Sequence, residues 1–163
     1  MILLGLGGNL PFDGYATPRA TLAAVIAALP AHGIAVAAVS PWFASAPVPP
    51  SDQPWYVNAV ARIETALSPE AALAALQAVE RAFGRVRGAP NAARTVDLDL
   101  LAWGRLIRTA GPPPLLPHPR MTARAFVLAP LAALEPGWRH PQSGQTAAAL
   151  LAALPPGQPL EVI

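Results

Sequence analysis

The chain has 163 residues, of which 53% are hydrophobic and 12% are charged, with a formal net charge of +2. This composition excludes an intrinsically disordered chain and favours one globular domain over residues 1–163 with a substantial core. The small charge without basic runs argues against nucleic acid, no apolar run approaches the ~18 residues of a membrane span, and the lack of cysteine excludes disulfides and thiolate sites.

Sequence patterns predict an alternation of strands and helices. Two helix starts carry the same signal, a hydroxyl residue followed by proline, at Thr17-Pro18 and Ser68-Pro69. In chain order we expect a strand at 2–6, a helix at 17–29, strands at 34–43 and 56–65, a helix at 68–84, a strand at 94–103, helices at 122–133 and 145–153, and a C-terminal extended segment. The order predicts an α+β fold: a ferredoxin-like β-α-β-β-α-β core with additional C-terminal helices, in three α-β-α layers.

Two aspartates, Asp97 and Asp99, stand inside an apolar run of a predicted strand. Because residues i and i+2 of a strand point to the same face, both carboxylates are expected to project together. Burying an unpaired carboxylate costs several kcal/mol, so cationic groups are expected beside them. The nearby Arg85, Arg87 and Arg94 complete a frame suited to Mg²⁺ and a polyphosphate. The alternative is an aspartate pair that faces water or forms ordinary ion pairs.

Other polar residues suggest contacts to a nucleotide and to a flat ligand. His118 lies between two prolines, and its imidazole could bond a phosphate oxygen or a nucleotide, although a lone histidine is usually structural. Tyr56 and Asn58 share one face of a predicted strand, where an amide edge suits a planar heterocycle; ordinary sheet surface is the alternative. His32 and His140 have no such neighbours and are expected at the surface.

Taken together, these residues resemble the 6-hydroxymethyl-7,8-dihydropterin pyrophosphokinase family of folate biosynthesis. Four segments carry the likeness in the family's order and spacing: LGLGGNL (4–10), DQPWYVNAVARIET (52–65), GRVRGAPNAARTVDLDLL (84–101) and LPHPRMTARAFVLAPLAALEP (116–136). The combination of R-T-x-D-L-D-L-L with P-H-P-R is highly specific. The family transfers the β,γ-pyrophosphoryl group of ATP to the pterin hydroxymethyl oxygen and releases AMP, and the resemblance implies this activity here.

The resemblance also implies roles for individual residues. Two Mg²⁺ ions would be held by Asp97 and Asp99, with Arg85 and Arg94 as further catalytic residues. The matching ATP-site positions are Gln77, Glu80, Arg87, His118 and Arg124. The matching pterin-pocket positions are Gly7, Ser45, Ala46, Val48, Tyr56, Asn58 and Phe126. In the family, the residues matching Tyr56 and Phe126 bracket the ring and the one matching Asn58 reads its edge.

The chain departs from the family pattern at three places. Gly8 stands where the family usually has serine, and Ser45-Ala46 where some members have Thr-Pro. The loop 87–94 is one residue shorter than in some members and lacks the tryptophan that closes over their pterin. We expect the loop 84–93 to be mobile without ligand, and its closure to depend on ATP and metal more than on pterin stacking.

The expected partners are therefore the small molecules ATP and 6-hydroxymethyl-7,8-dihydropterin, with no nucleic acid and no membrane. The N-terminus lacks the basic region of a signal peptide, so we expect a cytoplasmic protein, and a monomer. Two alternatives stay open. A two-metal nucleotidyltransferase would release pyrophosphate instead of AMP, and a ferredoxin-like ligand-binding or regulatory module would show no magnesium-dependent turnover.

Overall fold

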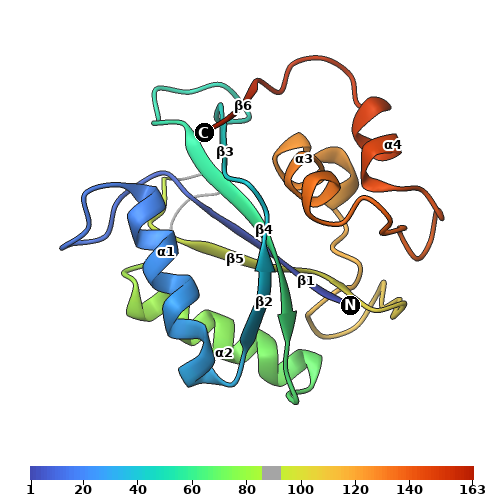
Figure 1. The fold of residues 1–163 in the computed structure, drawn as a ribbon, viewed down its shortest axis with the longest axis horizontal. Helices are drawn as coiled ribbons and strands as arrows, with labels where there is room; N and C mark the ends of the chain where they lie inside the picture. Colours follow the sequence, from blue (N-terminus) through green and yellow to red (C-terminus); the bar gives the residue numbers. More distant parts are fainter. Residues whose placement is uncertain (86–92) are drawn as a thin grey trace.

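The computed structural model describes residues 1–85 and 93–163, in which a six-stranded sheet combines with four α-helices (Figure 1). The fold is therefore α+β. The strands are β1 (Ile2–Gly8), β2 (Ala35–Val39), β3 (Phe43–Ser45), β4 (Tyr56–Glu64), β5 (Asp97–Trp103) and β6 (Leu160–Val162). The helices are α1 (Pro18–Ala28), α2 (Pro69–Ala82), α3 (Ala125–Leu134) and α4 (Ala147–Ala152), with short 3₁₀ turns at Leu29–His32 and Met121–Ala123.

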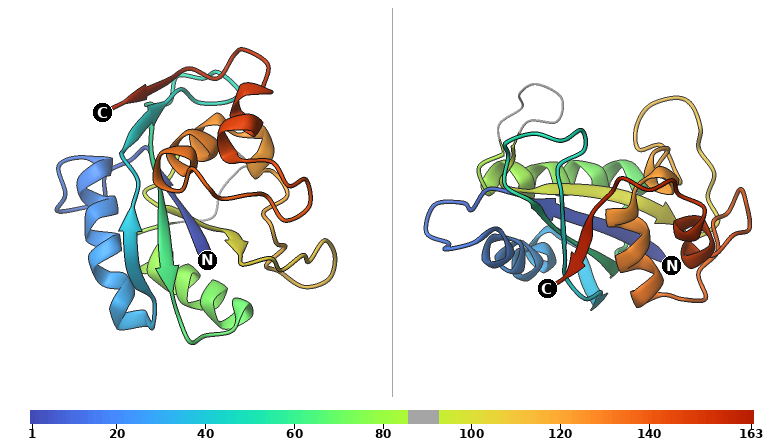
Figure 2. Two further views of the ribbon diagram at one scale, coloured as in Figure 1. Left: turned by 45° about the vertical axis from the view of Figure 1, so that its right-hand side comes forward. Right: turned by 90° about the horizontal axis from the view of Figure 1, so that it is seen from above.

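The sheet is antiparallel at each of its pairings. Its strand order is β5-β1-β4-β3-β6, and β2 pairs with β4 off this path. The long strand β4 pairs with both short strands. Its first three residues pair with β3 and its last four with β2. At the far edge, the C-terminal strand β6 runs beside β3 (Figure 2). Two segments far apart in sequence, the β3–β4 region and the C-terminus, thus form one end of the sheet.

The prediction of a single strand at 34–43 is wrong, because the structure has two strands there, β2 and β3. Ser40 and Pro41 occupy the break. The Ser40 backbone N–H donates to the Val60 carbonyl at 2.8 Å, and its hydroxyl accepts from the Val60 N–H at 2.9 Å. Pro41 has no N–H with which to continue the ladder, so the chain leaves β4 here and rejoins it as β3.

The two helix starts predicted from hydroxyl–proline pairs are confirmed. Thr17 caps α1 by accepting from the Ala20 N–H at 3.1 Å, and Ser68 caps α2 by accepting from the Ala71 N–H at 3.1 Å. The strand expected from residue 94 begins only at Asp97. The Arg94 carbonyl instead accepts from the Asn9 and Leu10 N–H groups, at 3.0 and 3.1 Å, which holds this approach segment against the end of β1.

Apolar side chains fill both faces of the sheet. Leu98 and Leu100 of β5 belong to the core formed with α1 and α2, whereas Leu101 packs in a second core formed with α3 and α4. In Figure 1, α3 and α4 lie together, away from α1 and α2. Since neighbouring strand residues point to opposite faces, Asp97 and Asp99 lie on the face opposite Leu98 and Leu100. Over the described ranges, no helix combines the length and apolarity needed to span a membrane.

Candidate active site

Arginines surround the aspartate pair on β5. The Asp97 carboxylate accepts from Arg85 Nη1 at 2.6 Å through Oδ1 and from Arg94 Nη1 at 3.1 Å through Oδ2. Arg124 Nη1 lies 3.9 Å from Asp99 Oδ2. The expectation that cations hold these half-buried carboxylates is confirmed. Burial and the negative charge of Asp97 raise the pKa of Asp99 to about 6, although the arginines oppose the shift.

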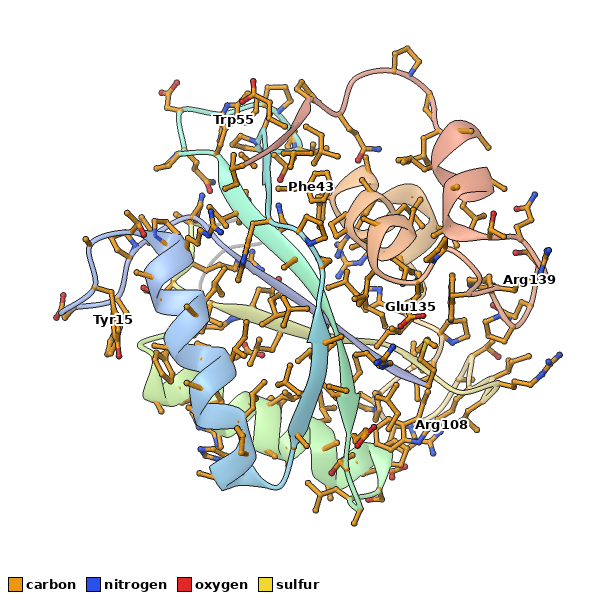
Figure 3. All side chains as sticks on the ribbon, viewed as in Figure 1. Tyr15, Phe43, Trp55, Arg108, Glu135 and Arg139 are labelled. Atoms are coloured by element: carbon orange, nitrogen blue, oxygen red, sulfur yellow. The ribbon has the colours of Figure 1, made fainter. Side chains whose placement is uncertain are left out.

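Not every arginine belongs to this cluster. Arg108 pairs with Glu70, and Arg139 donates to the Gly144 carbonyl at 2.9 Å. Both lie at the edge of the molecule (Figure 3). The grouping of Arg85, Arg94 and Arg124 around two carboxylates is therefore a local feature and does not follow simply from the arginine-rich composition.

A third carboxylate stands behind the cluster. Glu80, on the last turns of α2, is 8% exposed and forms a close ion pair with Arg85. Arg85 thus bridges Glu80 and Asp97. Burial raises the pKa of Glu80 to about 7; the like charges of Asp97 and Asp99 add to the rise, and Arg85 opposes it. The folded protein consequently binds a proton at Glu80 more tightly than the unfolded chain does.

We expect this carboxyl to make stability fall with rising pH. The stability it contributes is present below the unfolded pKa of 4.5 and is lost as pH rises through about 7, up to about 3 kcal/mol. Glu80→Gln should flatten this loss in urea unfolding compared at about pH 5 and about pH 8. Glu64→Gln, at an exposed position on β4, is the matched control and should keep the wild-type slope. An unchanged slope in Glu80→Gln would contradict the assignment.

His118 enters the site from the segment after β5. Its backbone N–H donates to the Leu101 carbonyl at 2.8 Å, and its Nδ1 accepts from the Arg120 N–H at 3.1 Å, which assigns the ring proton to Nε2. Burial, together with Arg124 and Arg120, lowers the pKa of His118 to about 4. The ring is thus a neutral donor near pH 7. His140, expected at the surface, is instead 6% exposed, and its Nδ1 accepts backbone N–H groups of its own turn.

One cavity of about 410 Å³ opens beside the cluster. Its lining includes all seven pterin-pocket positions implied by the family resemblance, together with three residues of the charged cluster. The seven are Gly7, Ser45, Ala46, Val48, Tyr56, Asn58 and Phe126, and the three are Arg94, Asp97 and Arg124. The structure therefore brings residues from β1, β3, β4, β5 and α3 to one place.

The polar floor of this cavity is held in a fixed orientation. Asn58 is 5% exposed, and its Nδ2 donates to the Ser45 hydroxyl at 2.7 Å. Gly7 faces Asn58 on one side and Asp97 on the other in the sheet register. A Cβ atom at Gly7 would lie 2.9 Å from Asn58 Oδ1, so a larger residue would displace the amide. Glycine at this position keeps the amide beside the carboxylate cluster.

The remaining predicted residues lie outside the cavity lining or outside the described ranges. Gln77 is half-buried on α2, on the same helix as Glu80, while Arg85, Asp99 and His118 lie in the charged region that adjoins the cavity through Asp97. Arg87 lies outside the described residues. We also expect the loop 84–93 to be mobile and to close on ligands. Most of this loop, residues 86–92, lies outside the described residues.

Sequence reasoning missed a buried amide that connects the two halves of the site. Asn9 is 1% exposed; its Oδ1 accepts from the Arg94 N–H at 2.9 Å. Its Nδ2 donates to Gln53 Oε1 and to the Pro54 carbonyl, both at 3.1 Å, and the Tyr56 hydroxyl lies 3.4 Å from the same Gln53 oxygen. Asparagine directly after a buried strand was the available signal, but by itself this pattern indicates only a turn.

At Gly8, where the family usually has serine, the structure leaves no room for a side chain. A Cβ atom on Gly8 would lie 2.5 Å from the Thr95 carbonyl oxygen and 3.1 Å from its carbonyl carbon. Both are backbone atoms, so a side chain could not be accommodated by a rotamer change alone. Gly8 lets the segment of Arg94 and Thr95 lie directly on β1, where Asn9 binds it.

We expect Gly8→Ala to push this segment away. The free energy of unfolding should fall by about 1–3 kcal/mol, as for other overpacking substitutions, and kcat should fall because Arg94 moves with the backbone. Gly137→Ala is the matched control, since an added Cβ there meets no atom within 4 Å. Urea unfolding and steady-state kinetics of both variants measure the difference. Wild-type stability and kcat in Gly8→Ala would show that the contact is unimportant.

A carboxylate pair and an arginine cluster beside a cavity, on the antiparallel sheet of an α+β fold, are the features expected of an enzyme that transfers phosphate groups. The family model for 7,8-dihydro-6-hydroxymethylpterin-pyrophosphokinase (HPPK) matches residues 3–136, and the chain belongs to this family. It is 43% identical to the 2-amino-4-hydroxy-6-hydroxymethyldihydropteridine pyrophosphokinase of Pseudomonas aeruginosa, over 94% of this chain and 91% of that one. The enzyme of the same name from Synechocystis sp. is 40% identical, over 88% and 71%.

A solved structure shows the same fold. The HPPK-DHPS protein of Plasmodium falciparum superposes with a TM-score of 0.67 at 12% identity, covering 93% of this chain. The chain spans 43% of the length of that protein. At 12% identity, this likeness bears on the fold alone.

Proposed function

We propose that this chain transfers the pyrophosphoryl group of ATP to the hydroxymethyl oxygen of 6-hydroxymethyl-7,8-dihydropterin, giving the pterin diphosphate and AMP in folate biosynthesis. Membership of the HPPK family over residues 3–136 supports this reaction. Among the residues themselves, the shared cavity gives this reaction its main support. Seven pterin-pocket candidates and three phosphate-side candidates line the same space, as a transfer between two bound substrates requires.

The apolar and amide-bearing end of the cavity is the proposed pterin pocket. Tyr56 and Phe126 offer ring faces for stacking, and Asn58 offers an amide edge to the heterocycle. The hydrogen bond from Asn58 to Ser45 supports this role, because it fixes which way the amide points before ligand arrives. Gly7, Ala46 and the more exposed Val48 would complete the walls.

The donor set on β5 fits magnesium. Asp97 and Asp99 share a face; burial and then the negative charge of Asp97 raise the pKa of Asp99, and a bound cation would oppose this rise. Among the described residues no group of three or more His, Cys, Asp or Glu side chains is placed to hold a metal by itself. Two carboxylates completed by water and phosphate oxygens suit Mg²⁺. Two Mg²⁺ ions, when bound, would neutralise charge on the triphosphate.

The arginines would bind and stabilise the phosphates. Arg85 and Arg94 pair with Asp97 in the structure, which keeps both guanidinium groups beside the proposed metal ligands, where charge develops during transfer. Arg124, Gln77, Glu80 and the undescribed Arg87 are proposed ATP-site residues. Neutral His118 would donate from Nε2 to a nucleotide or phosphate acceptor. A loose phosphoryl-type transfer asks mainly for alignment and charge stabilisation.

We assign the β1-α1-β2-β4-α2-β5 part to the ferredoxin-like class, with α3 and α4 as the third layer. The antiparallel neighbours β5-β1-β4, with β2 on the other side of β4, support this assignment. One domain over residues 1–163, a monomeric state and a cytoplasmic location stay predictions.

Product analysis tests the proposed function. The chain is incubated with ATP, Mg²⁺ and the pterin alcohol, and the nucleotides are separated by chromatography. We expect AMP in equal amount to pterin diphosphate. Release of pyrophosphate would indicate a nucleotidyltransferase, ADP would indicate a simple kinase, and no magnesium-dependent turnover would indicate a binding module.

A further inference from the structure

Gln158, in the C-terminal segment, binds the backbone at the start of α3. Its Nε2 donates to the Ala123 carbonyl at 2.9 Å, and its Oε1 accepts from the Ala125 N–H at 2.9 Å. One side-chain amide therefore binds the backbone on both sides of Arg124. Gln158 also lines the cavity, next to Ala123, Arg124 and Phe126.

The bond to Ala125 satisfies a requirement of the helix end. Arg124 is the N-cap residue of α3, and its guanidinium has no acceptor atom with which to cap the helix. The first free N–H of the helix, that of Ala125, is bound instead by a side chain 33 residues further along the chain. The start of α3 is thus fixed from outside the helix.

The segment that carries Gln158 is itself fastened to the opposite wall of the cavity. The Pro159 carbonyl accepts from the Ala46 N–H at 3.2 Å, and β6 pairs with β3 so that Leu160 faces Ser45. Figure 2 shows this strand lying along β3. Gln158 therefore connects the wall that holds Ser45 and Ala46 with the wall that holds Arg124 and Phe126.

We propose that Gln158 is a positioning residue for the pterin pocket, setting the distance between these two walls; this rests on the proposed function. Gln158 lies outside residues 3–136, which the family model matches, so the family motifs do not account for it. It acts through Phe126, whose ring also lies under the Arg124 guanidinium, 5.4 Å from centroid to Cζ. Displacing the start of α3 moves both side chains together.

Two variants separate this role from general stabilisation. Gln158→Met keeps the length of the side chain and removes both hydrogen bonds, whereas Gln158→Glu keeps the acceptor for Ala125 and loses the donor. We expect the KM for the pterin to rise about tenfold in Gln158→Met, with kcat within about threefold of wild type. Gln158→Glu should give an intermediate KM. Hydrogen exchange of the Ala125 amide should quicken in Gln158→Met.

Gln142→Met is the matched control, because Gln142 is exposed and lies outside the cavity lining. It should leave KM and exchange unchanged. If Gln158→Met melts at a lower temperature but keeps a wild-type pterin KM, Gln158 is only structural and the proposal is wrong. A wild-type chain that makes no AMP would overturn the proposed function and this inference together. An active wild type with unaffected Gln158 variants would overturn this inference alone.

Discussion

Replacing Asp97 or Asp99 by alanine is expected to abolish magnesium-dependent turnover while the protein stays folded. The two carboxylates share one face of β5 beside the cavity, and loss of either removes half of the proposed metal-binding donors. The two variants should differ in stability. Asp99→Ala removes a half-buried carboxyl whose ionisation is opposed by burial and by Asp97, and should be neutral or stabilising. Asp97→Ala removes the ion pairs that this carboxylate forms with Arg85 and Arg94 and should be destabilising.

Initial rates with and without Mg²⁺, together with thermal unfolding, measure both effects. Asp13→Ala, at an exposed position in the loop after β1, serves as the control and should retain full activity. Metal-dependent activity near that of wild type in either Asp97→Ala or Asp99→Ala would refute their assignment as metal ligands.

Arg85→Ala and Arg94→Ala are expected to lower kcat by roughly 10²-fold or more, with a much smaller effect on ATP binding. A loss of this size corresponds to about 3 kcal/mol of transition-state stabilisation from each guanidinium. Both arginines lie beside the proposed metal ligands, next to Asp97, and are therefore near the place where charge develops during transfer. ATP binding is measured separately by calorimetry, with a nonhydrolysable analogue.

Arg81→Ala provides the matched control for Arg85, because Arg81 lies in the last turn of α2, shortly before Arg85 in the chain, but is exposed. Its kcat should be unchanged. A variant of Arg85 or Arg94 in which only KM rises, with kcat preserved, would show that the arginine binds the ground state and does not favour the transition state.

Local signals in the sequence were sufficient for much of the fold. The hydroxyl–proline pairs placed the starts of α1 and α2 because capping is determined within four residues. Period-two alternation likewise placed Asp97 and Asp99 on one face. The break at Ser40 and Pro41 was missed, since it depends on how Ser40 bonds to β4, twenty residues away in sequence. The pairing of β6 with β3 was missed for the same reason.

In the site, as in the fold, the features that the sequence did not predict depend on contacts between distant parts of the chain. The family resemblance predicted the seven cavity residues, and the aspartates and arginines around residues 85–99 predicted the charged cluster; the structure places both at one cavity. Asn9 and Gln158 were not identified. Each acts by bonding backbone groups far away in the chain, and an amide side chain carries no sequence signal for such a partner. These long-range contacts set the geometry that the motifs then use.

The most direct test of the central claim follows the phosphorus atoms themselves. ATP labelled in the β-phosphate and ATP labelled in the α-phosphate are each incubated with the chain, Mg²⁺ and 6-hydroxymethyl-7,8-dihydropterin. Transfer of the β,γ-pyrophosphoryl group predicts that the β label appears in the pterin product and that the α label stays in AMP. Appearance of the α label in the pterin product, or failure of the β label to reach it, would contradict the account.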